Sequence, residues 1–162
     1  MTMLAPFRVI DLTDHRGNLA AMILGQLGAE VIAIEPPGGT DARRQAPFAG
    51  DTADPERSLV HWSYNRGKRS VVWDLAGSTA DRDRFLALVA GADILIEDRA
   101  PGELAAIGLG AEALGAANPA LVHVSITPFG QDGPKAGYAH SDLVLMAAGG
   151  YLALTGDEDR AP

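Results

Sequence analysis

The chain has 162 residues, a length at which a single domain can bury a core without disulfides or structural metals. Hydrophobic residues make up 47% and charged residues 21%, a balance typical of globular rather than disordered proteins. The absence of cysteine excludes disulfides, thiolate metal sites and a cysteine nucleophile. The net charge of −8 argues against a nucleic-acid binder, which needs a basic face. With no predicted signal peptide or membrane span, we expect a soluble, cytoplasmic protein.

The first part of the chain predicts a β-α-β unit. Residues 7–12 (FRVIDL) and 30–35 (EVIAIE) are predicted strands, and residues 17–27 are an apolar stretch of helical length. Gly28 is suited to end the helix, and two prolines from Pro36 onward stop the second strand. Because the helix is apolar on most faces, we expect it to be buried between layers. Such a unit within about 30 residues indicates a parallel sheet.

The same alternation continues after a proline-rich interruption at residues 36–57, which we expect to be an irregular loop. Ser78 with Asp81 predicts a capping box, Pro101 a first helical residue and Ser141 the N-cap of the last helix. Residues 129–138 are a predicted turn-rich loop. The further predicted strands are 70–74, 94–97 and 121–127, and the further predicted helices are 78–90, 101–108, one from 111, and 141–148.

Strands that alternate with helices predict one α/β domain over residues 1–162. Its sheet should be Rossmann-like, open and mainly parallel, with helices on both faces. Ligands of such sheets bind beyond the carboxyl ends of the strands. The loops expected to face a ligand are therefore 13–18, 35–41, 74–78, 97–102 and 127–142.

A nicotinamide-binding function is the first alternative for this layout. Glu35 ends the second strand, where an acidic residue would hold a ribose. The turn at residues 13–18 has one glycine where the dinucleotide fingerprint has three, so its backbone could not approach a pyrophosphate closely. This function is therefore not favoured. Phosphate-loop and serine-hydrolase motifs do not occur in the sequence.

The histidines and one basic run are further candidates for chemistry. The four histidines have no ligand spacing, so no metal site is predicted. His123 alternates with valines and is expected to be packed, whereas His15 and His140 fall in ligand-side loops. Residues 65–70 (NRGKRS) leave two interpretations open: a solvated loop, or a local patch for phosphate or for structural ion pairs.

Between Phe7 and Gly156, a collinear set of motifs resembles class III CoA-transferases. The motifs are VIDLT at 9–13, LGAEVI at 27–32, EPPGG at 35–39, NRGKRSVVWD at 65–74, ADILIE at 92–97, PG at 101–102, LG at 109–110, NP at 118–119, VS at 124–125, FGQDGP at 129–134 and LTG at 154–156. Each is weak alone, but the ordered set is specific. The family includes formyl-CoA and carnitine CoA-transferases and, as a divergent branch, alpha-methylacyl-CoA racemase.

The resemblance implies an enzyme that moves coenzyme A between carboxylic acids, without a tightly bound cofactor. Members have a Rossmann-like large domain, a small domain and two interlocked subunits. The resemblance implies that an aspartate attacks the acyl-CoA thioester, which forms a mixed anhydride and releases the CoA thiolate. The thiolate then attacks the anhydride, which forms an aspartyl thioester and releases the donor acid, and CoA passes from this thioester to the acceptor acid. Backbone donors from glycine-rich segments stabilise the oxyanion.

The family's nucleophilic aspartate lies in a Gly-Asp pair beyond the Leu-Thr-Gly segment. Here only residues 157–162 follow that segment, and neither Asp157 nor Asp159 fits the pattern. We therefore assign no catalytic residue and expect the chain, as the N-terminal portion of a member, to be inactive alone. The alternative is a stand-alone, non-catalytic module that binds CoA or another nucleotide.

The resemblance also implies a substrate pocket near the last helix, at His140, Ser141 and Asp142. Asp142 matches a family pocket acid, although it could simply stabilise the helix dipole. The racemase branch has a catalytic histidine directly before this aspartate, where this chain has Ser141. Racemase activity is therefore less expected than CoA transfer.

Motif positions finally imply which residues border CoA. They are His15, Arg16, Pro36, Trp73, Asp74, Leu75, Asp98 and Arg99. Pro36 and Ala106 stand where many members have an arginine, and the residues that could compensate are Arg43, Arg44, Lys68 and Arg99. The turn after the first strand is one residue short, with Asn18 in place of a proline. The apolar stretch 143–148 should make the chain prone to association.

Overall fold

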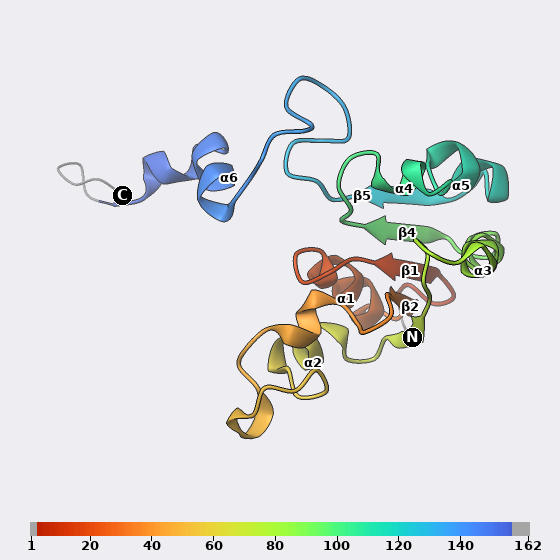
Figure 1. Ribbon diagram of the computed structural model, residues 1–162, viewed down its shortest axis with the longest axis horizontal. Coiled ribbons are helices and arrows are strands. Elements are labelled where there is room, and N and C mark those ends of the chain that lie inside the picture. The colour runs from red at the N-terminus through yellow and green to blue at the C-terminus, as the bar shows by residue number, and fades with distance from the viewer. Residues whose placement is uncertain (1–2, 157–162) are drawn as a thin grey trace.

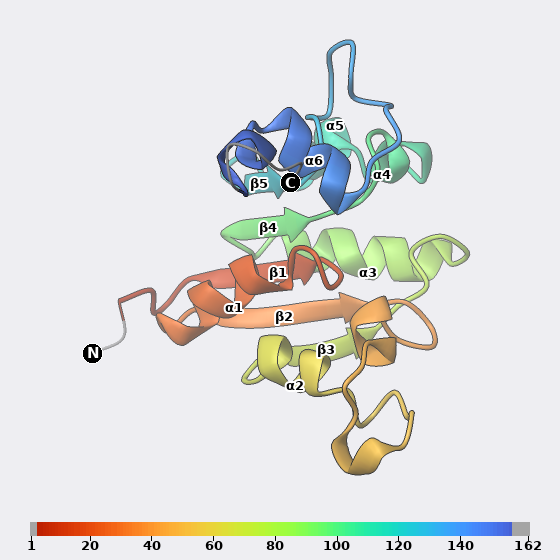
Figure 2. The ribbon, with the colours of Figure 1, turned by 90° about the vertical axis from the view of Figure 1, so that its left-hand side faces the viewer.

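The computed structural model describes residues 3–156, whose centre is a five-stranded, fully parallel sheet. The strand order is β3-β2-β1-β4-β5, and the carboxyl ends of all five strands lie along the same edge of the sheet (Figure 2). The central strand pairs on both sides, with Ile10 opposite Ile32 and Leu95. The strands are β1 (Arg8–Leu12), β2 (Glu30–Glu35), β3 (Arg69–Val72), β4 (Ile94–Glu97) and β5 (Val122–Ser125). The predicted fold class is confirmed.

Helix α1 (Asn18–Gln26) connects β1 to β2. The N–H groups of Gly28 and Ala29 donate to the carbonyls of Gly25 and Leu24, which closes the helix, and Gly28 has φ +108° as its predicted role requires. The expected burial of the helix on most faces is wrong. Ala21 is fully buried against the sheet, whereas a stripe on the opposite side is exposed, namely Leu19, Ile23 and Leu27. The described chain covers only one face of this helix.

The connection from β2 to β3 contains a helix that the sequence did not predict, α2 (Leu59–Asn65), after two short 3-10 turns, η1 (Asp41–Arg44) and η2 (Ala49–Asp51). Ser58 caps α2 by accepting the His61 N–H at 3.2 Å. The Ser58 hydroxyl also lies 2.8 Å from the carbonyl oxygen of Ala42, so the cap joins α2 to the preceding loop. Seven residues after a proline-rich loop gave too short a periodic signal to detect.

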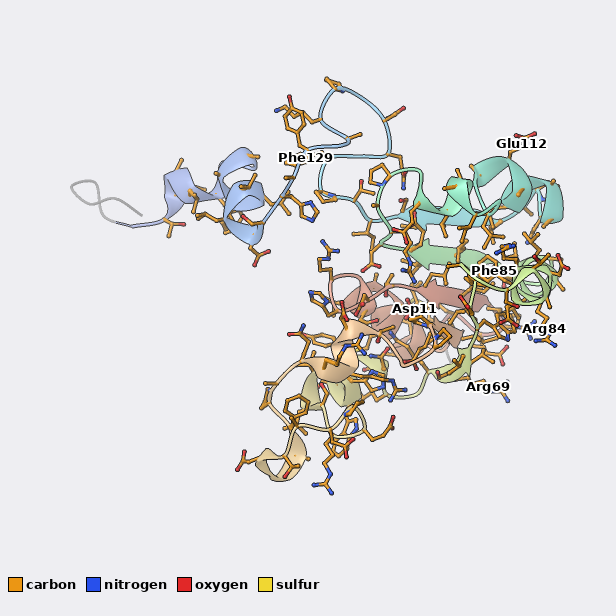
Figure 3. The ribbon with its side chains drawn as sticks, viewed as in Figure 1. Asp11, Arg69, Arg84, Phe85, Glu112 and Phe129 are labelled. Atoms are coloured by element: carbon orange, nitrogen blue, oxygen red, sulfur yellow. The ribbon has the colours of Figure 1, made fainter. Side chains whose placement is uncertain are left out.

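The opposite face of the sheet is covered by α3 (Thr79–Val89), α4 (Glu103–Ala106) and α5 (Ala111–Ala117). They contribute Phe85, Leu104 and Leu114 to the larger apolar cluster, and Phe85 is fully buried between α3 and the sheet (Figure 3). Ser78 caps α3 as predicted, with the Asp81 N–H at 3.2 Å. Asp81 accepts from the Asp74 N–H rather than from Ser78, so the predicted capping box is only half formed.

Two smaller expectations, about α4 and β5, also need correction. Pro101 is not the first residue of α4, because Gly102 is the N-cap, in the left-handed region at φ +81°. His123 is not packed in the interior: β5 is an edge strand, and its residues are mostly exposed. The edge position removes the second neighbour that would have buried this histidine.

The last described segment extends away from the sheet as an arm (residues 139–156; Figure 1). It contains α6 (Asp142–Ala148) and η3 (Tyr151–Leu154), which pack on each other. Ser141 caps α6 as predicted, with the Val144 N–H at 3.3 Å. Within the described part of the arm no residue is buried, and Leu154 is 85% exposed. Across residues 3–156, no helix has the length and apolar character needed to cross a membrane.

Candidate functional site

Three buried carboxylates lie at or near the carboxyl ends of β1, β2 and β4: Asp11, Glu35 and Glu97. Ligands of open parallel sheets bind beyond this edge. Each carboxylate has partners inside the protein, which offset the free-energy cost of removing it from water. For Glu97, one oxygen accepts the Arg99 N–H at 2.7 Å and the other lies 3.3 Å from the Gln131 amide nitrogen.

Glu35 is occupied by an internal ion pair. Arg43 donates to its two oxygens at 2.6 and 2.8 Å, and Ser70 donates to one of them at 2.6 Å. The Arg43 hydrogen bonds, opposed by burial and helped by Ser70, lower the pKa of Glu35 to about 2. A carboxylate with both oxygens engaged has little capacity left for ribose hydroxyls. The geometry therefore argues further against the nicotinamide alternative.

Lys68 and Asp11 form the most deeply buried ion pair, with Nζ 2.7 Å from Oδ2 and side-chain exposures of 2% and 1%. Lys68 also donates to the Asn18 carbonyl at 3.2 Å and to Asn65 Oδ1 at 3.0 Å. In the same basic run, Arg69 pairs with Glu30 at 2.7 Å. These contacts favour the interpretation of residues 65–70 as a source of structural ion pairs.

Of the four basic residues considered as replacements for a phosphate-binding arginine, two are committed to internal contacts. Lys68 is buried on Asp11, and Arg43 is held by Glu35 and Glu56. Arg44 and Arg99 keep side-chain exposures of 52% and 36% and have mostly exposed carboxylate partners. These two are the better placed of the four to meet an anionic ligand.

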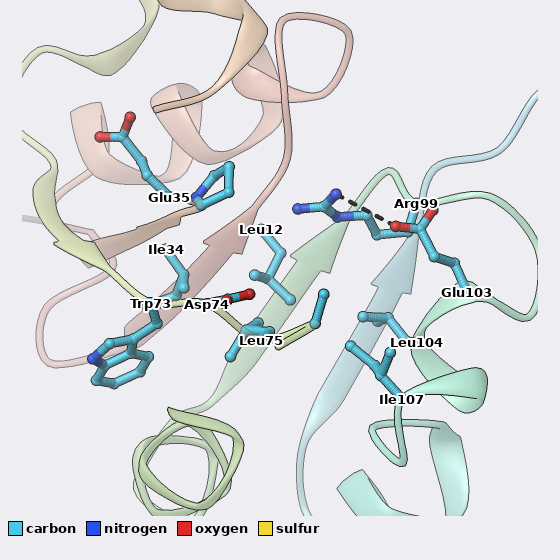
Figure 4. Close-up of a pocket in the computed structure, with 12 residues that line it drawn as sticks. Leu12, Ile34, Glu35, Trp73, Asp74, Leu75, Arg99, Glu103, Leu104 and Ile107 are labelled. Atoms are coloured by element: carbon cyan, nitrogen blue, oxygen red, sulfur yellow. Dashed lines mark hydrogen bonds and ion pairs between the residues drawn. The ribbon is translucent and has the colours of Figure 1, made fainter. Parts of the chain in front are cut away.

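Five of the predicted CoA-contact residues line one open cavity at the edge of the sheet: Pro36, Trp73, Asp74, Leu75 and Arg99. Figure 4 shows Arg99 with Glu103 on one side of the cavity, and Glu35 with Trp73 on the other. Leu12 and Ile34 belong to its apolar lining. The cavity encloses about 100 Å³, whereas enclosed ligand sites hold roughly 300–1,000 Å³. A molecule as large as CoA would extend beyond it over the open edge.

The other three predicted CoA-contact residues lie on the loops beside this cavity. Asp98 accepts the Asp14 N–H with both oxygens at 3.0 Å, and burial raises the pKa of Asp98. His15 and Arg16 follow Asp14 in the turn and are exposed. The site thus joins the loops after β1, β2, β3 and β4.

The predicted substrate-pocket residues His140, Ser141 and Asp142 all lie on the arm. Arg16 donates to His140 Nε2 at 2.7 Å, so these two sequence-predicted residues do come together. The Ser141 hydroxyl serves as the cap of α6, and Asp142 occupies its first turn, where a carboxylate favours the helix dipole. Asp157 and Asp159 lie outside the described residues.

Two residues of this edge escaped the sequence analysis. Glu103 lines the cavity and lies 3.5 Å from Arg99, and its only signal was a position directly after the ligand-side loop 97–102. Asp14 lies inside the predicted loop 13–18, but nothing in its spacing distinguished it from an ordinary turn residue. Its carboxylate accepts the N–H groups of Asp41 and Ala42 at 2.9 Å, contacts 27 and 28 residues away that a local pattern does not reveal.

Curated relatives of this chain are CoA-transferases of several specificities. The BbsE subunit of succinyl-CoA:(R)-benzylsuccinate CoA-transferase from Thauera aromatica is 41% identical, over 96% of this chain and 38% of that protein. Succinyl-CoA:mesaconate CoA-transferase from Haloarcula hispanica is 37% identical, over 100% and 42%. Acetyl-CoA:oxalate CoA-transferase from Acetobacter aceti is 41% identical, over 95% and 39%. The chain thus spans about two-fifths of the length of these relatives.

Solved structures share the fold of this chain. A CAIB/BAIF family protein from Brucella suis superposes with a TM-score of 0.86 and 38% identity, over 97% of this chain and 42% of that one. A hypothetical protein from Mycobacterium tuberculosis superposes with a TM-score of 0.83 and 33% identity, over 100% and 44%. The sequence pattern of CoA-transferase family III matches residues 4–162. The chain belongs to CoA-transferase family III.

Proposed function

We propose that the whole protein transfers coenzyme A between carboxylic acids and that this chain supplies the CoA-binding part. The observation that carries the proposal is the cavity at the sheet edge, where Pro36, residues 73–75 and Arg99 meet although they come from three separate loops. The relatives' names support the reaction, since each describes CoA passing between two acids.

The electrostatics of the edge support an anionic ligand in spite of the net charge of −8. The buried carboxylates Asp11 and Glu35 are neutralised by Lys68 and Arg43. Exposed guanidinium groups remain on the surrounding loops, at Arg16, Arg44 and Arg99. Guanidinium groups suit phosphate because they donate in a planar fork. We propose that CoA lies across this edge with its phosphates near Arg44 and Arg99.

We propose that the acceptor is a short dicarboxylic acid. Relatives that match nearly the whole chain are named for succinyl-CoA with mesaconate or glutarate, and for acetyl-CoA with oxalate. The second carboxylate of such an acid needs a cationic partner. Arg16 is the candidate for this role, because its hydrogen bond to His140 Nε2, at 2.7 Å, joins the edge to the predicted substrate pocket.

The nucleophile is proposed to lie outside this chain. Among the described residues, the buried carboxylates of the edge are already engaged: Asp11 by Thr13 and Lys68, Glu35 by Arg43 and Ser70, and Glu97 by the Arg99 N–H. Attack on a thioester needs a carboxylate oxygen free to approach the acyl carbon. The aspartyl-CoA thioester mechanism therefore requires a carboxylate from elsewhere, and the chain alone should not catalyse transfer.

Titration calorimetry with CoA tests the binding half of this proposal. The chain should bind CoA, and Arg99→Ala should weaken binding by about tenfold, the usual effect of losing one charge-assisted contact. Arg84→Ala is the matched control, because Arg84 pairs with Asp81 three residues away and does not line the cavity. Equal effects of the two substitutions would contradict the proposed site.

A transfer assay with succinyl-CoA and a dicarboxylate acceptor tests the catalytic half. The full-length protein should form the acceptor's CoA thioester, and this chain should not. A full-length protein that binds CoA but transfers nothing would favour the alternative, a non-catalytic CoA or nucleotide-binding module.

We also propose a cytoplasmic location, which is argued from the cysteine-free composition.

A further proposal concerns the exposed apolar residues of the arm. Leu143, Val144 and Met146 on α6 are 66%, 44% and 40% exposed, which is unusual for neighbouring large apolar residues. We propose that the whole protein forms an interlocked homodimer and that these residues make the isolated chain associate. Sedimentation should show mass increasing with concentration. A strict monomer at high concentration would contradict it.

A further inference from the structure

Asp14 links three of the loops that form the edge of the sheet. Its N–H donates to both carboxylate oxygens of Asp98 at 3.0 Å, in the loop after β4. Its own carboxylate accepts the N–H groups of Asp41 and Ala42, each at 2.9 Å, in the loop after β2. Asp14 itself lies in the turn after β1. We propose that Asp14 and Asp98 are positioning residues that assemble the CoA site from these three loops; the inference rests on the proposed function.

The backbone neighbours of these bonds are the residues expected to meet CoA. Asp14 directly precedes His15 and Arg16, and Asp98 directly precedes Arg99, which lines the cavity. The loop after β2 begins at Pro36, which also lines it. Because each link lies within six residues of a predicted contact, a loop that moves takes part of the site with it. One carboxylate pair therefore sets the relative positions of groups from three loops.

This arrangement gives Asp98 a different role from the one that its motif position implied. Both of its oxygens accept the Asp14 N–H, and the group is half-buried. Burial, together with the neighbouring Asp14 carboxylate, raises the pKa of Asp98. An ionised carboxylate next to a second carboxylate repels the phosphates of CoA. The geometry thus assigns Asp98 to holding the turn after β1, and leaves the contact with CoA to Arg99.

Gly17 supplies an independent sign that the turn and Asp98 are fitted to each other. A Cβ atom at position 17 would lie 2.6 Å from the Thr13 side chain and 3.2 Å from Asp98 Oδ2. The Thr13 contact is too close for any Cβ atom, so a side chain at this position would displace the turn, and the Asp98 carboxylate would also have to shift by a few tenths of an ångström. The only glycine of the turn is explained by this close approach rather than by a dinucleotide.

Amide hydrogen exchange tests the link without requiring any ligand. Asp98 accepts from Asp14 and not from Asp41 or Ala42, yet Asp98→Ala should accelerate exchange of both of their N–H groups by about tenfold, because Asp14 would lose its anchor. Asp14→Asn should accelerate the same two groups directly. Asp54→Asn is the matched control: Asp54 accepts the Glu56 N–H at 2.8 Å in the loop after β2, but its bonds stay within that loop.

CoA titration of the same variants tests the consequence. Asp98→Ala should weaken CoA binding by about tenfold, Asp98→Asn by less, and Asp54→Asn not at all. Weaker binding with unchanged exchange at Asp41 and Ala42 would mean that Asp98 contacts CoA directly, which overturns the inference. Faster exchange with unchanged affinity would overturn it too.

Failure of the proposed function and failure of this inference give different results. If the unsubstituted chain does not bind CoA, the proposed binding role of this chain fails, while exchange still decides whether Asp98 controls the loop after β2. Thermal unfolding of each variant shows whether it is folded, and Asp98→Asn keeps one acceptor oxygen should the alanine variant fail to fold.

Discussion

The sheet domain and the arm contain similar apolar sequences, but those of the sheet domain are buried and those of the arm are exposed. On β4, Leu95 and Ile96 are 0% and 2% exposed, whereas Leu143 on α6 is 66% exposed. Local signals start helices equally well in both regions, since Ser141 caps α6 in the same way that Ser78 caps α3. Capping fixes where a helix starts, but only a packing partner buries its apolar face. The comparison separates what a segment encodes by itself from what it needs from the rest of a protein.

The exposed apolar stripe of α1 resembles the arm, because no described residue covers it. Leu19 and Ile23 are about half exposed although they lie on a helix of the sheet domain. The relatives are more than twice as long as this chain. We propose that residues present in such longer proteins cover both surfaces.

The largest expected difference between the two regions comes from removing an apolar side chain from each. Phe85→Ala in the core should lower the free energy of unfolding by about 4 kcal/mol, because Phe85 is fully buried. Leu143→Ala on α6 should leave it unchanged, since most of that side chain is already in water. Urea unfolding followed by circular dichroism measures both. A comparable loss for Leu143→Ala would mean that the arm is packed in solution.

A buried ion pair inside the sheet domain should give the next largest effect. Lys68→Met would leave the Asp11 carboxylate buried without its cation, at a cost of about 3 kcal/mol in the free energy of unfolding. Arg69→Met is the control from the same basic run. Its side chain is 75% exposed, so its loss should be hard to measure by urea unfolding. Equal effects would show that Lys68 is not the structural member of this run.

Acid should reveal the third effect, through Glu35. Its pKa is about 2 in the folded protein against an ordinary 4.5, so its contribution to stability is complete above pH 4.5 and is lost as pH falls from there through 2. The loss should be on the order of 2 kcal/mol, because solvent screens part of the interaction. The difference in unfolding free energy between the protein and Glu35→Gln should shrink over that range. A constant difference would contradict the Arg43–Glu35 pairing.

The strength of local signals explains how much of the fold was predictable. Strands β2 and β4 were predicted at their observed bounds, because each is a short apolar run with clear ends. Helix α2 was missed because its seven residues follow a proline-rich loop and depend on Ser58, whose partners Ala42 and Gln45 are 16 and 13 residues away. The exposure of α1 could not be predicted, since an apolar stripe indicates burial without saying what supplies the partner.

The clustering of several candidate-site residues was predictable from the sequence, but their hydrogen-bond and ion-pair partners were not. The resemblance and the rule that ligands bind at strand ends indicated Pro36, residues 73–75 and Arg99, which the structure brings to one cavity. Structural ion pairs were one interpretation of residues 65–70, but the partners of Lys68, Arg43 and Asp98 were not foreseen, because no local pattern shows which carboxylate or N–H group the fold places beside them. A basic or acidic residue in a motif shows charge, whereas only the fold shows whether that charge is already paired.

The smallest expected effect is also the most direct test of the two-region comparison, because it makes one chemical change in both. Ser78→Ala removes the cap of α3 and should cost about 1 kcal/mol in the free energy of unfolding. Ser141→Ala removes the equivalent bond to Val144 in α6, yet it should leave the urea midpoint unchanged and only lower helicity, because no residue of α6 is buried. If both substitutions shift the midpoint equally, the arm unfolds together with the sheet, and its exposure does not reflect independent folding.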